Sequence, residues 1–131
     1  MFFKLFFIAL PLFLALDMTW LGFLARDYYR SQIGSLLKDQ VNWVAALVFY
    51  AIYISGLVTF VLIPAVTKHS WQSALLMGAF FGFVAYATYD LTNLAVAKNW
   101  TLSVTLVDLA WGTVLAGTVS VLTYWIAARI G

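Results

Sequence analysis

The fold of this chain is decided by the apolar run at residues 72–97, QSALLMGAFFGFVAYATYDLTNLAVA, in which Asp90 is the single charged residue. A helix that crosses the hydrocarbon core of a bilayer needs about 20 apolar residues. The run is longer than this, and it lacks the ~10-residue alternation that is typical of a barrel strand. We therefore expect it to cross a membrane as a helix.

Three further runs have the same character, at about 2–25, 41–63 and 103–128. We predict an all-α, polytopic integral membrane protein, a four-transmembrane-helix bundle that forms a single membrane domain over residues 1–131. Pro64 is expected to close the second run, and Asn99 marks the third connection. The first run has no clear small-x-small cleavage site, so we interpret it as a retained span.

The composition also indicates that most of the chain is surrounded by lipid. Of 131 residues, 65% are hydrophobic and 9% are charged, whereas soluble domains are about 25% charged. A small soluble fold could not bury so much apolar surface, which excludes a soluble enzyme, a disordered chain and a nucleic-acid binder. With no Cys and one His, we expect no disulfide, no structural zinc and no cofactor.

The first connection, residues 26–40, is long enough to hold structure of its own. Apolar residues recur there at helical spacing between positions 33 and 41, with polar residues on the other side. This pattern predicts a short interfacial helix that lies on the membrane. The seven basic residues divide three against four between the two sides, so the orientation of the chain in the membrane stays open.

Three of the five acidic residues lie inside the spans, at Asp17, Asp90 and Asp108. Each costs about 2.5–3.5 kcal/mol at a helix centre on insertion scales. At a rise of about 1.5 Å per residue, each lies about 12–13 Å from the helix end on the side of the first and third connections. We therefore expect one polar layer, to which the second helix adds Tyr50, with Tyr53 one turn deeper.

The helical faces predict that this layer points into the bundle. Gly112 and Ala116 form a small-x-x-x-small pattern beside Asp108, which allows a close approach of two helices. The third helix has a similar stripe of small and then polar residues on one face. That stripe contains Gly78, Gly82, Tyr86, Tyr89, Asp90, Asn93 and Ala97.

Each of the three acids is followed, three residues later, by a side chain that can donate a hydrogen bond. Carboxyls grouped in a low dielectric form a coupled set, with at least one of them protonated near neutral pH. Such a set could relay protons, hold a cation or act as a general acid, or it could simply join the helices by hydrogen bonds. The predicted ligand or proton site comprises Asp17, Asp90, Asp108, Asn93, Tyr50, Tyr53, Tyr89, Trp20 and Trp111.

Arg26 and Arg30 follow the first span and are four residues apart. They could clamp the phosphate of a lipid headgroup, although anchoring at the interface is the commoner role of such residues. His69 stands alone in a short connection, so no metal site is predicted.

The chain resembles a family of uncharacterised bacterial membrane proteins, domain of unknown function 2177. The most specific matches are DMTWLG at 17–22, YATYDLTNLA at 86–95 and VDLAWG at 107–112. The resemblance covers the whole chain and implies a small, multi-pass protein of the bacterial inner (cytoplasmic) membrane. It implies no established activity.

Three functions stay open at this point. The first is binding or transport, including proton-coupled transport, of a small cationic or lipophilic ligand at the three acids. The second is a membrane enzyme or lipid-binding protein that uses a buried Asp as general acid. The third is a structural membrane subunit without a ligand. The expected partners are membrane lipids and such a ligand, with a homodimer as one oligomeric state and no nucleic acid.

Overall fold

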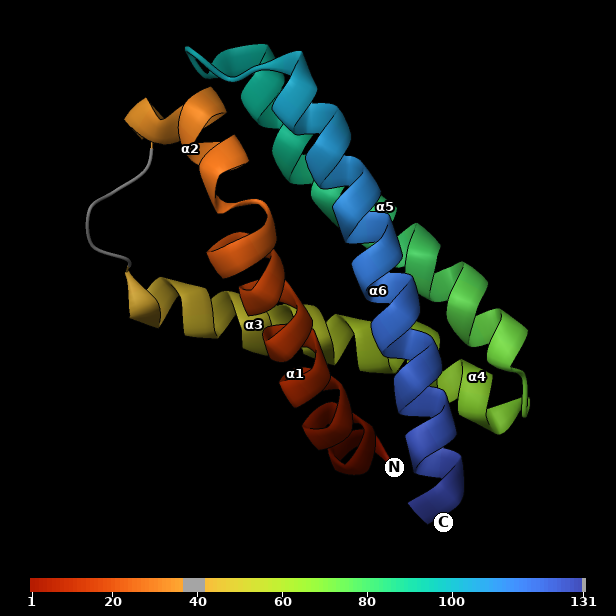
Figure 1. Ribbon diagram of the computed structural model, residues 1–131. Helices are drawn as coiled ribbons and strands as arrows, with labels where there is room; N and C mark the ends of the chain where they lie inside the picture. The colour runs from red at the N-terminus through yellow and green to blue at the C-terminus, as the bar shows by residue number, and fades with distance from the viewer. Residues whose placement is uncertain (37–41, 131) are drawn as a thin grey trace.

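A computed structural model of the protein describes residues 1–36 and 42–130, and this part of the chain is helical without any strand (Figure 1). Within it, four helical segments are long and apolar enough to cross a membrane: Phe2–Leu24, Trp43–Thr67, Trp71–Val96 and Leu102–Ile130. The prediction of an all-α protein with four such helices is confirmed.

Two of the four segments contain a π-helical turn. The first is α1 (Phe2–Thr19) followed by η1 (Trp20–Leu24), in which the N–H of Ala25 donates to the Trp20 carbonyl oxygen at 2.8 Å, a bond that spans five residues. The second is α3 (Trp43–Leu57), η3 (Val58–Leu62) and α4 (Ile63–Thr67). The other two are α5 (Trp71–Val96) and α6 (Leu102–Ile130).

The prediction that Pro64 closes the second span is wrong, because the helix continues through α4 to Thr67. Pro64 lies in the first turn of α4, directly after the π-helical turn. A missing backbone N–H and a fixed φ are tolerated at this position of a helix. Asn99 does mark the connection between α5 and α6, where it adopts a positive φ of 64°.

A short helix occupies the first connection, as expected, but at a different place. It is α2 (Arg26–Ile33), followed by one 3-10 turn, η2 (Gly34–Leu36). The sequence placed it at 33–41, of which residues 37–41 lie outside the described part of the chain. The helix starts earlier because Ala25, Tyr29 and Ile33, spaced four residues apart, bury one face of α2 against Val104 of α6.

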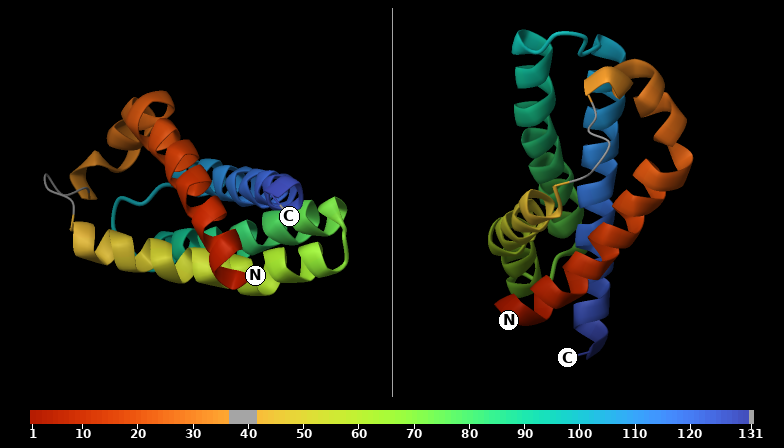
Figure 2. Two further views of the ribbon diagram at one scale, coloured as in Figure 1. Left: turned by 90° about the horizontal axis from the view of Figure 1, so that it is seen from below. Right: turned by 90° about the vertical axis from the view of Figure 1, so that its left-hand side faces the viewer.

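α5 and α6 form a closely packed antiparallel pair (Figures 1 and 2). A Cβ added at Gly82 would lie 2.2 Å from the carbonyl oxygen of Gly112, and one added at Gly78 would lie 2.3 Å from Oγ of Ser120. The helices can approach this closely only because side chains are missing at these positions. The expected role of the small residues is confirmed.

The hydrophobic core lies toward the end of the molecule that holds both chain termini (Figure 1). There α1, α3 with η3, and α6 meet around Phe13, Ile54, Leu57 and Leu115, which are all buried. Toward the opposite end, the start of α3 diverges from α5 and α6, as the views in Figure 2 also show. This divergence positions the site described below.

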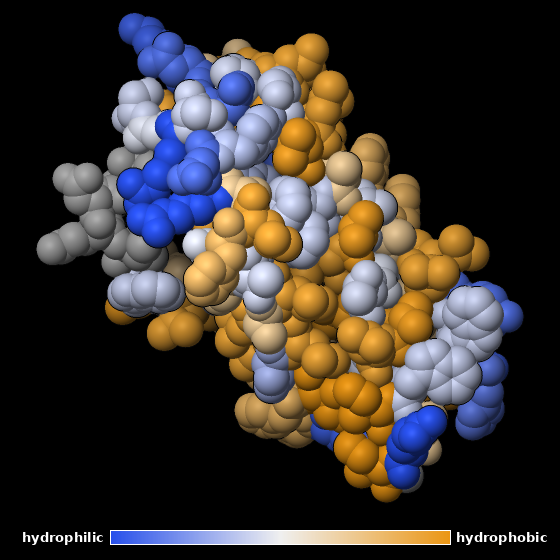
Figure 3. All heavy atoms as spheres, viewed as in Figure 1, coloured by the Kyte–Doolittle hydropathy of each residue, from blue (hydrophilic) through white to orange (hydrophobic). Residues whose placement is uncertain are grey.

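The outer faces of the long helices carry large apolar side chains, for example Phe7, Val48, Phe83 and Val114, all exposed. Figure 3 shows hydrophilic residues gathered over α2 at the upper left and in a smaller group at the lower right, with an apolar surface between them. An apolar belt between two polar ends is the surface that a membrane-spanning protein presents to lipid.

Candidate functional site

A cleft of about 1220 Å³ lies at the end where α3 diverges, bounded by η1, α2, the start of α3, and the facing parts of α5 and α6. Small-molecule sites are typically about 300–1,000 Å³, so this cleft has room for a ligand. Its polar lining includes Asp17, Asp108, Arg26 and Arg30. Its aromatic lining comprises Tyr29, Phe49, Tyr86, Tyr89, Trp100 and Trp111.

The packing of the core directs the predicted acids toward this end of the molecule. The buried residues of α1 are Leu5, Ala9, Phe13 and Asp17, each four residues after the last. Those of α5 are Ala74, Gly78, Gly82 and Asp90. A four-residue spacing keeps side chains on one face of a helix, so each acid continues the stripe that packs against the neighbouring helices.

Asp17 is almost completely buried, with 6% of its surface exposed. Its Oδ1 accepts a hydrogen bond from Nε1 of Trp111 at 3.2 Å, and its Oδ2 accepts one from the hydroxyl of Tyr50 at 3.5 Å. The carboxyl thus joins α1 to both α6 and α3. Both oxygens of the carboxyl therefore have a hydrogen-bond donor.

Asp108 is half-buried, and its Oδ1 accepts a hydrogen bond from the hydroxyl of Tyr29 at 2.8 Å. The Tyr29 oxygen in turn accepts one from Nε1 of Trp20 at 3.2 Å. An indole N–H can only donate, so the single hydroxyl proton of Tyr29 must point to Asp108.

Burial raises the pKa of the Tyr29 phenol above its ordinary value, and the nearby Asp108 charge raises it further. The phenol therefore remains a hydrogen-bond donor to Asp108 at neutral pH. The folded chain therefore binds the phenol proton more tightly than the unfolded chain does. This stabilises the fold fully at any pH below about 10, the pKa of the unfolded chain, and the stabilisation is lost as the pH rises above that value.

The rings of Trp20 and Trp111 stack on each other, with centroids 4.5 Å apart and planes 8° from parallel. Trp20 follows Asp17 by three residues but donates toward the Asp108 side through Tyr29, whereas Trp111 follows Asp108 by three residues and donates to Asp17. For Asp17 and Asp108, the donor three residues later therefore serves the acid of the other helix, directly for Trp111 and through Tyr29 for Trp20. The stacked rings connect the hydrogen bonds of Asp17 with those of Asp108.

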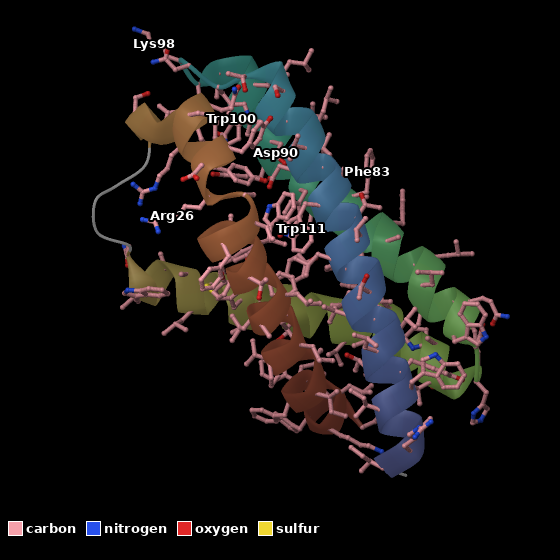
Figure 4. All side chains as sticks on the ribbon, viewed as in Figure 1. Arg26, Phe83, Asp90, Lys98, Trp100 and Trp111 are labelled. Carbon is pink, nitrogen blue, oxygen red and sulfur yellow. The ribbon has the colours of Figure 1, made fainter. Side chains whose placement is uncertain are left out.

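Asp90 lies behind the cleft rather than in its wall. It is completely buried, and neither carboxyl oxygen has a hydrogen-bond donor among the described residues. Its carboxyl lies within hydrogen-bonding reach of the Asp108 carboxyl. Figure 4 shows it in the upper half of the view, between Trp100 and Trp111. The predicted layer therefore divides into two acids that line the cleft and one that is enclosed.

The other predicted site residues lie in different places: in the cleft wall, beside the cleft, or in the hydrophobic core. Tyr89 lines the cleft, where its ring meets Trp100 edge-on at 5.6 Å. Tyr50 does not line the cleft itself but contacts two residues that do, Asp17 and Phe49, and Asn93 is partly buried on α5 outside the lining. Tyr53 is buried in the core, with its ring 4.8 Å from that of Phe13, so the structure does not bring it to the cleft.

A model of the family described as "Predicted membrane protein (DUF2177)" matches residues 2–125. The chain belongs to this family. The resemblance seen in the sequence is confirmed, and the matched range contains every residue that lines the cleft. No curated protein and no solved structure gives a match.

In this DUF2177 protein, α2 is tied to the start of α6 and forms one wall of the cleft. The hydroxyls of Tyr28 and Ser103 are hydrogen-bonded, and Oγ1 of Thr101 donates to Oε1 of Gln32 at 3.0 Å. Together with the Tyr29–Asp108 bond, these contacts hold the helix in place. Arg26 and Arg30 are exposed on α2 and both line the cleft; Figure 4 shows Arg26 between α2 and the start of α3.

The sequence interpretation of this DUF2177 protein did not include Tyr29, Phe49, Tyr86 or Trp100 among the site residues. For Tyr29 a signal was present, because Ala25, Tyr29 and Ile33 recur at a four-residue spacing that predicts a buried helical face. Tyr86 lies on the stripe that the sequence predicts to face the bundle. For Phe49, a helical wheel does not separate a cleft wall from a lipid-facing surface, and Trp100 lies in a connection, where no wheel applies.

Proposed function

We propose that the protein binds a small lipophilic ligand with a cationic or hydrogen-bond-donating end, and that this end lies at Asp108. The observation that carries the proposal is the cleft itself, in which a half-buried carboxyl faces a volume walled by aromatic rings. A mostly apolar pocket with a few convergent polar groups is the usual form of a small-molecule site.

Asp108 is the better anchor of the two acids in the cleft wall. Asp17 is nearly enclosed and already accepts two hydrogen bonds, whereas Asp108 is half-exposed and accepts one from Tyr29. A carboxylate offers about four lone-pair sites, so Asp108 retains capacity for a further donor. An ammonium or hydroxyl group of a ligand would supply it.

The aromatic walls suit the remainder of such a ligand. Tyr86, Tyr89, Trp100 and Trp111 line the cleft from α5, α6 and the connection between them. Their faces attract flat apolar groups and cations alike, and an enclosed cation–π contact contributes about 2 kcal/mol. These rings and the carboxyl together favour a lipophilic cation over a purely apolar molecule.

The first test fills the cleft. A Cβ at Gly22, which lines the cleft, would meet no atom within 4 Å, so the side chain of Gly22→Leu begins in open space. The probe is tetraphenylphosphonium, titrated in detergent and followed by tryptophan fluorescence and native mass spectrometry. We expect Gly22→Leu to weaken binding at least tenfold. The matched control, Ala110→Leu, adds the same side chain to an exposed position of α6 outside the cleft and should bind as the unmodified protein does.

Equal affinity of Gly22→Leu and Ala110→Leu for the probe would contradict binding in the cleft.

Transport is the extended form of the proposal, and uptake of the same cation into proteoliposomes under a pH gradient tests it separately. We also propose the bacterial inner membrane as the location, since the chain has helical spans, whereas outer-membrane spans are barrel strands.

A structural role is the second candidate, and the hydrogen bonds across helices favour it. Asp17 joins three helices, and Asp108 joins α2 to α6. Asp108→Asn separates the two candidates, because an amide oxygen still accepts from Tyr29 but attracts no cation. Ligand binding predicts a folded variant with weakened tetraphenylphosphonium binding. Unchanged probe affinity would favour the structural role.

A further inference from the structure

The packing of α5 on α6 places two acids opposite each other. A Cβ at Gly78 would face Ser120, one at Gly82 would face Ala116 and Gly112, and Gly112 itself faces the ring of Tyr86. Each step of four residues forward along α5 thus moves the contact about four residues back along α6. One further step from Tyr86 brings Asp90 to Asp108.

Asp90 has an environment that does not suit a charge. It is completely enclosed, and both of its oxygens lack a donor among the described residues. The ionisable groups near it are acidic: Asp108 on α6, Tyr29 on α2 and Tyr89 on α5. An isolated ionised carboxylate in such a place is costly, and a second carboxylate facing it adds repulsion.

We propose that Asp90 and Asp108 hold one proton between them at neutral pH, and that Asp90 carries this proton and donates it to Asp108. The pair then contains one proton, one negative charge and one O–H···O hydrogen bond. The shared proton gives a hydrogen-bond partner to one of the two enclosed Asp90 oxygens, which otherwise have none among the described residues.

The environment of Asp108 decides which partner carries the charge. Its Oδ1 accepts the hydroxyl proton of Tyr29, and its side chain is half-exposed in the cleft. A donor and access to solvent both favour a carboxylate. Asp90 has neither a donor nor access to solvent, so Asp90 is the carboxyl that carries the proton. The pair is a proton site that exists whether or not the cleft takes a ligand.

Infrared spectroscopy tests the proton directly. All five acidic side chains of the protein are Asp, so few carboxyls contribute to the spectrum. In a detergent without ester carbonyls at neutral pH, we expect the carbonyl band of one protonated carboxyl. The band should shift in heavy water and with a heavy-carbon label in the aspartate carboxyls. Absence of the band would overturn the proposal, without bearing on ligand binding.

Single variants assign the band. Asp90→Asn should remove it and keep the unfolding temperature, because the amide group donates to Asp108 as the protonated acid does. Asp17→Asn is the matched control and should retain the band, since Asp17 already has two donors. A band that persists in Asp90→Asn, or that disappears in Asp17→Asn, would contradict the assignment. Asp27→Asn, outside the spans, provides a second control that should also retain the band.

Discussion

At the scale of single residues, the site depends on the direction in which hydrogen bonds are donated. The indole N–H of Trp20 can only donate, so the Tyr29 hydroxyl accepts from Trp20 and directs its own proton to Asp108. The sequence predicted a donor three residues after each acid, and the donors are present. It could not predict that Trp20 and Trp111 each serve the acid of the other helix, because a helical wheel describes one helix at a time.

Loss of one hydroxyl should show how much this network stabilises the fold. Tyr29→Phe removes the donor to Asp108, and hydrogen bonds to charged groups contribute about 1.5–3 kcal/mol. We expect the free energy of unfolding to fall by about this amount. Thermal unfolding in one detergent, followed by circular dichroism, measures it.

Tyr28→Phe is the matched control for this prediction. Its hydroxyl pairs with the neutral Ser103 on the same two helices, and such a bond contributes about 0.5–1.5 kcal/mol. A loss in Tyr28→Phe as large as that in Tyr29→Phe would mean that docking of α2, rather than the charge on Asp108, accounts for the effect.

At the scale of helices, the pairing of α5 with α6 is the part that sequence patterns predict best. Small residues at four-residue intervals indicate a close contact, and the structure has that contact at Gly78, Gly82 and Gly112. The start of α2 and the course of the chain past Pro64 were predicted less well. The start of α2 does have a signal, the four-residue spacing of Ala25, Tyr29 and Ile33, whereas the course past Pro64 depends on a widened turn that has no period in the sequence.

Gly82→Ala should disrupt the helix pair. Its Cβ would lie 2.6 Å from Cβ of Ala116 and 2.2 Å from a backbone oxygen of α6, so the helices must separate. Overpacking of this kind costs about 1–3 kcal/mol. We expect a lower unfolding temperature and, because Asp90 and Asp108 lie along the same stripe, a weaker band of the protonated carboxyl.

Gly117→Ala provides the comparison within the same helix pair. The nearest atom to its added Cβ would be Cβ of Ala79 at 3.4 Å, an ordinary contact. Replacing a helical glycine by alanine then stabilises by about 0.5–1 kcal/mol. If both variants destabilise the protein equally, close packing at Gly82 is not what holds the pair together.

At the scale of the whole molecule, the polar ends and the apolar belt define how the chain crosses a membrane. Both termini lie at one end, and the first and third connections lie at the other (Figure 1). The sequence predicted these spans from length and hydropathy alone. It could not predict the cleft, because the divergence of α3 from α5 and α6 leaves no periodic pattern.

The topology can be tested cleanly, because the chain contains no cysteine of its own. Lys68→Cys and Lys98→Cys place a single thiol in the second or the third connection, both at exposed positions. We expect an impermeant maleimide to label them from opposite sides of sealed vesicles. Labelling of both from the same side only would contradict four membrane crossings.

The π-helical turn at Trp20–Leu24 has a consequence for chain length. Such a turn is an α-helix that accommodates one additional residue, and removing that residue would restore regular helix. Everything after the deletion would be turned by about 100° about the axis, which would direct Arg26 and Tyr29 away from the cleft. We therefore expect a relative with a one-residue gap at this place to keep the four helices but not the cleft.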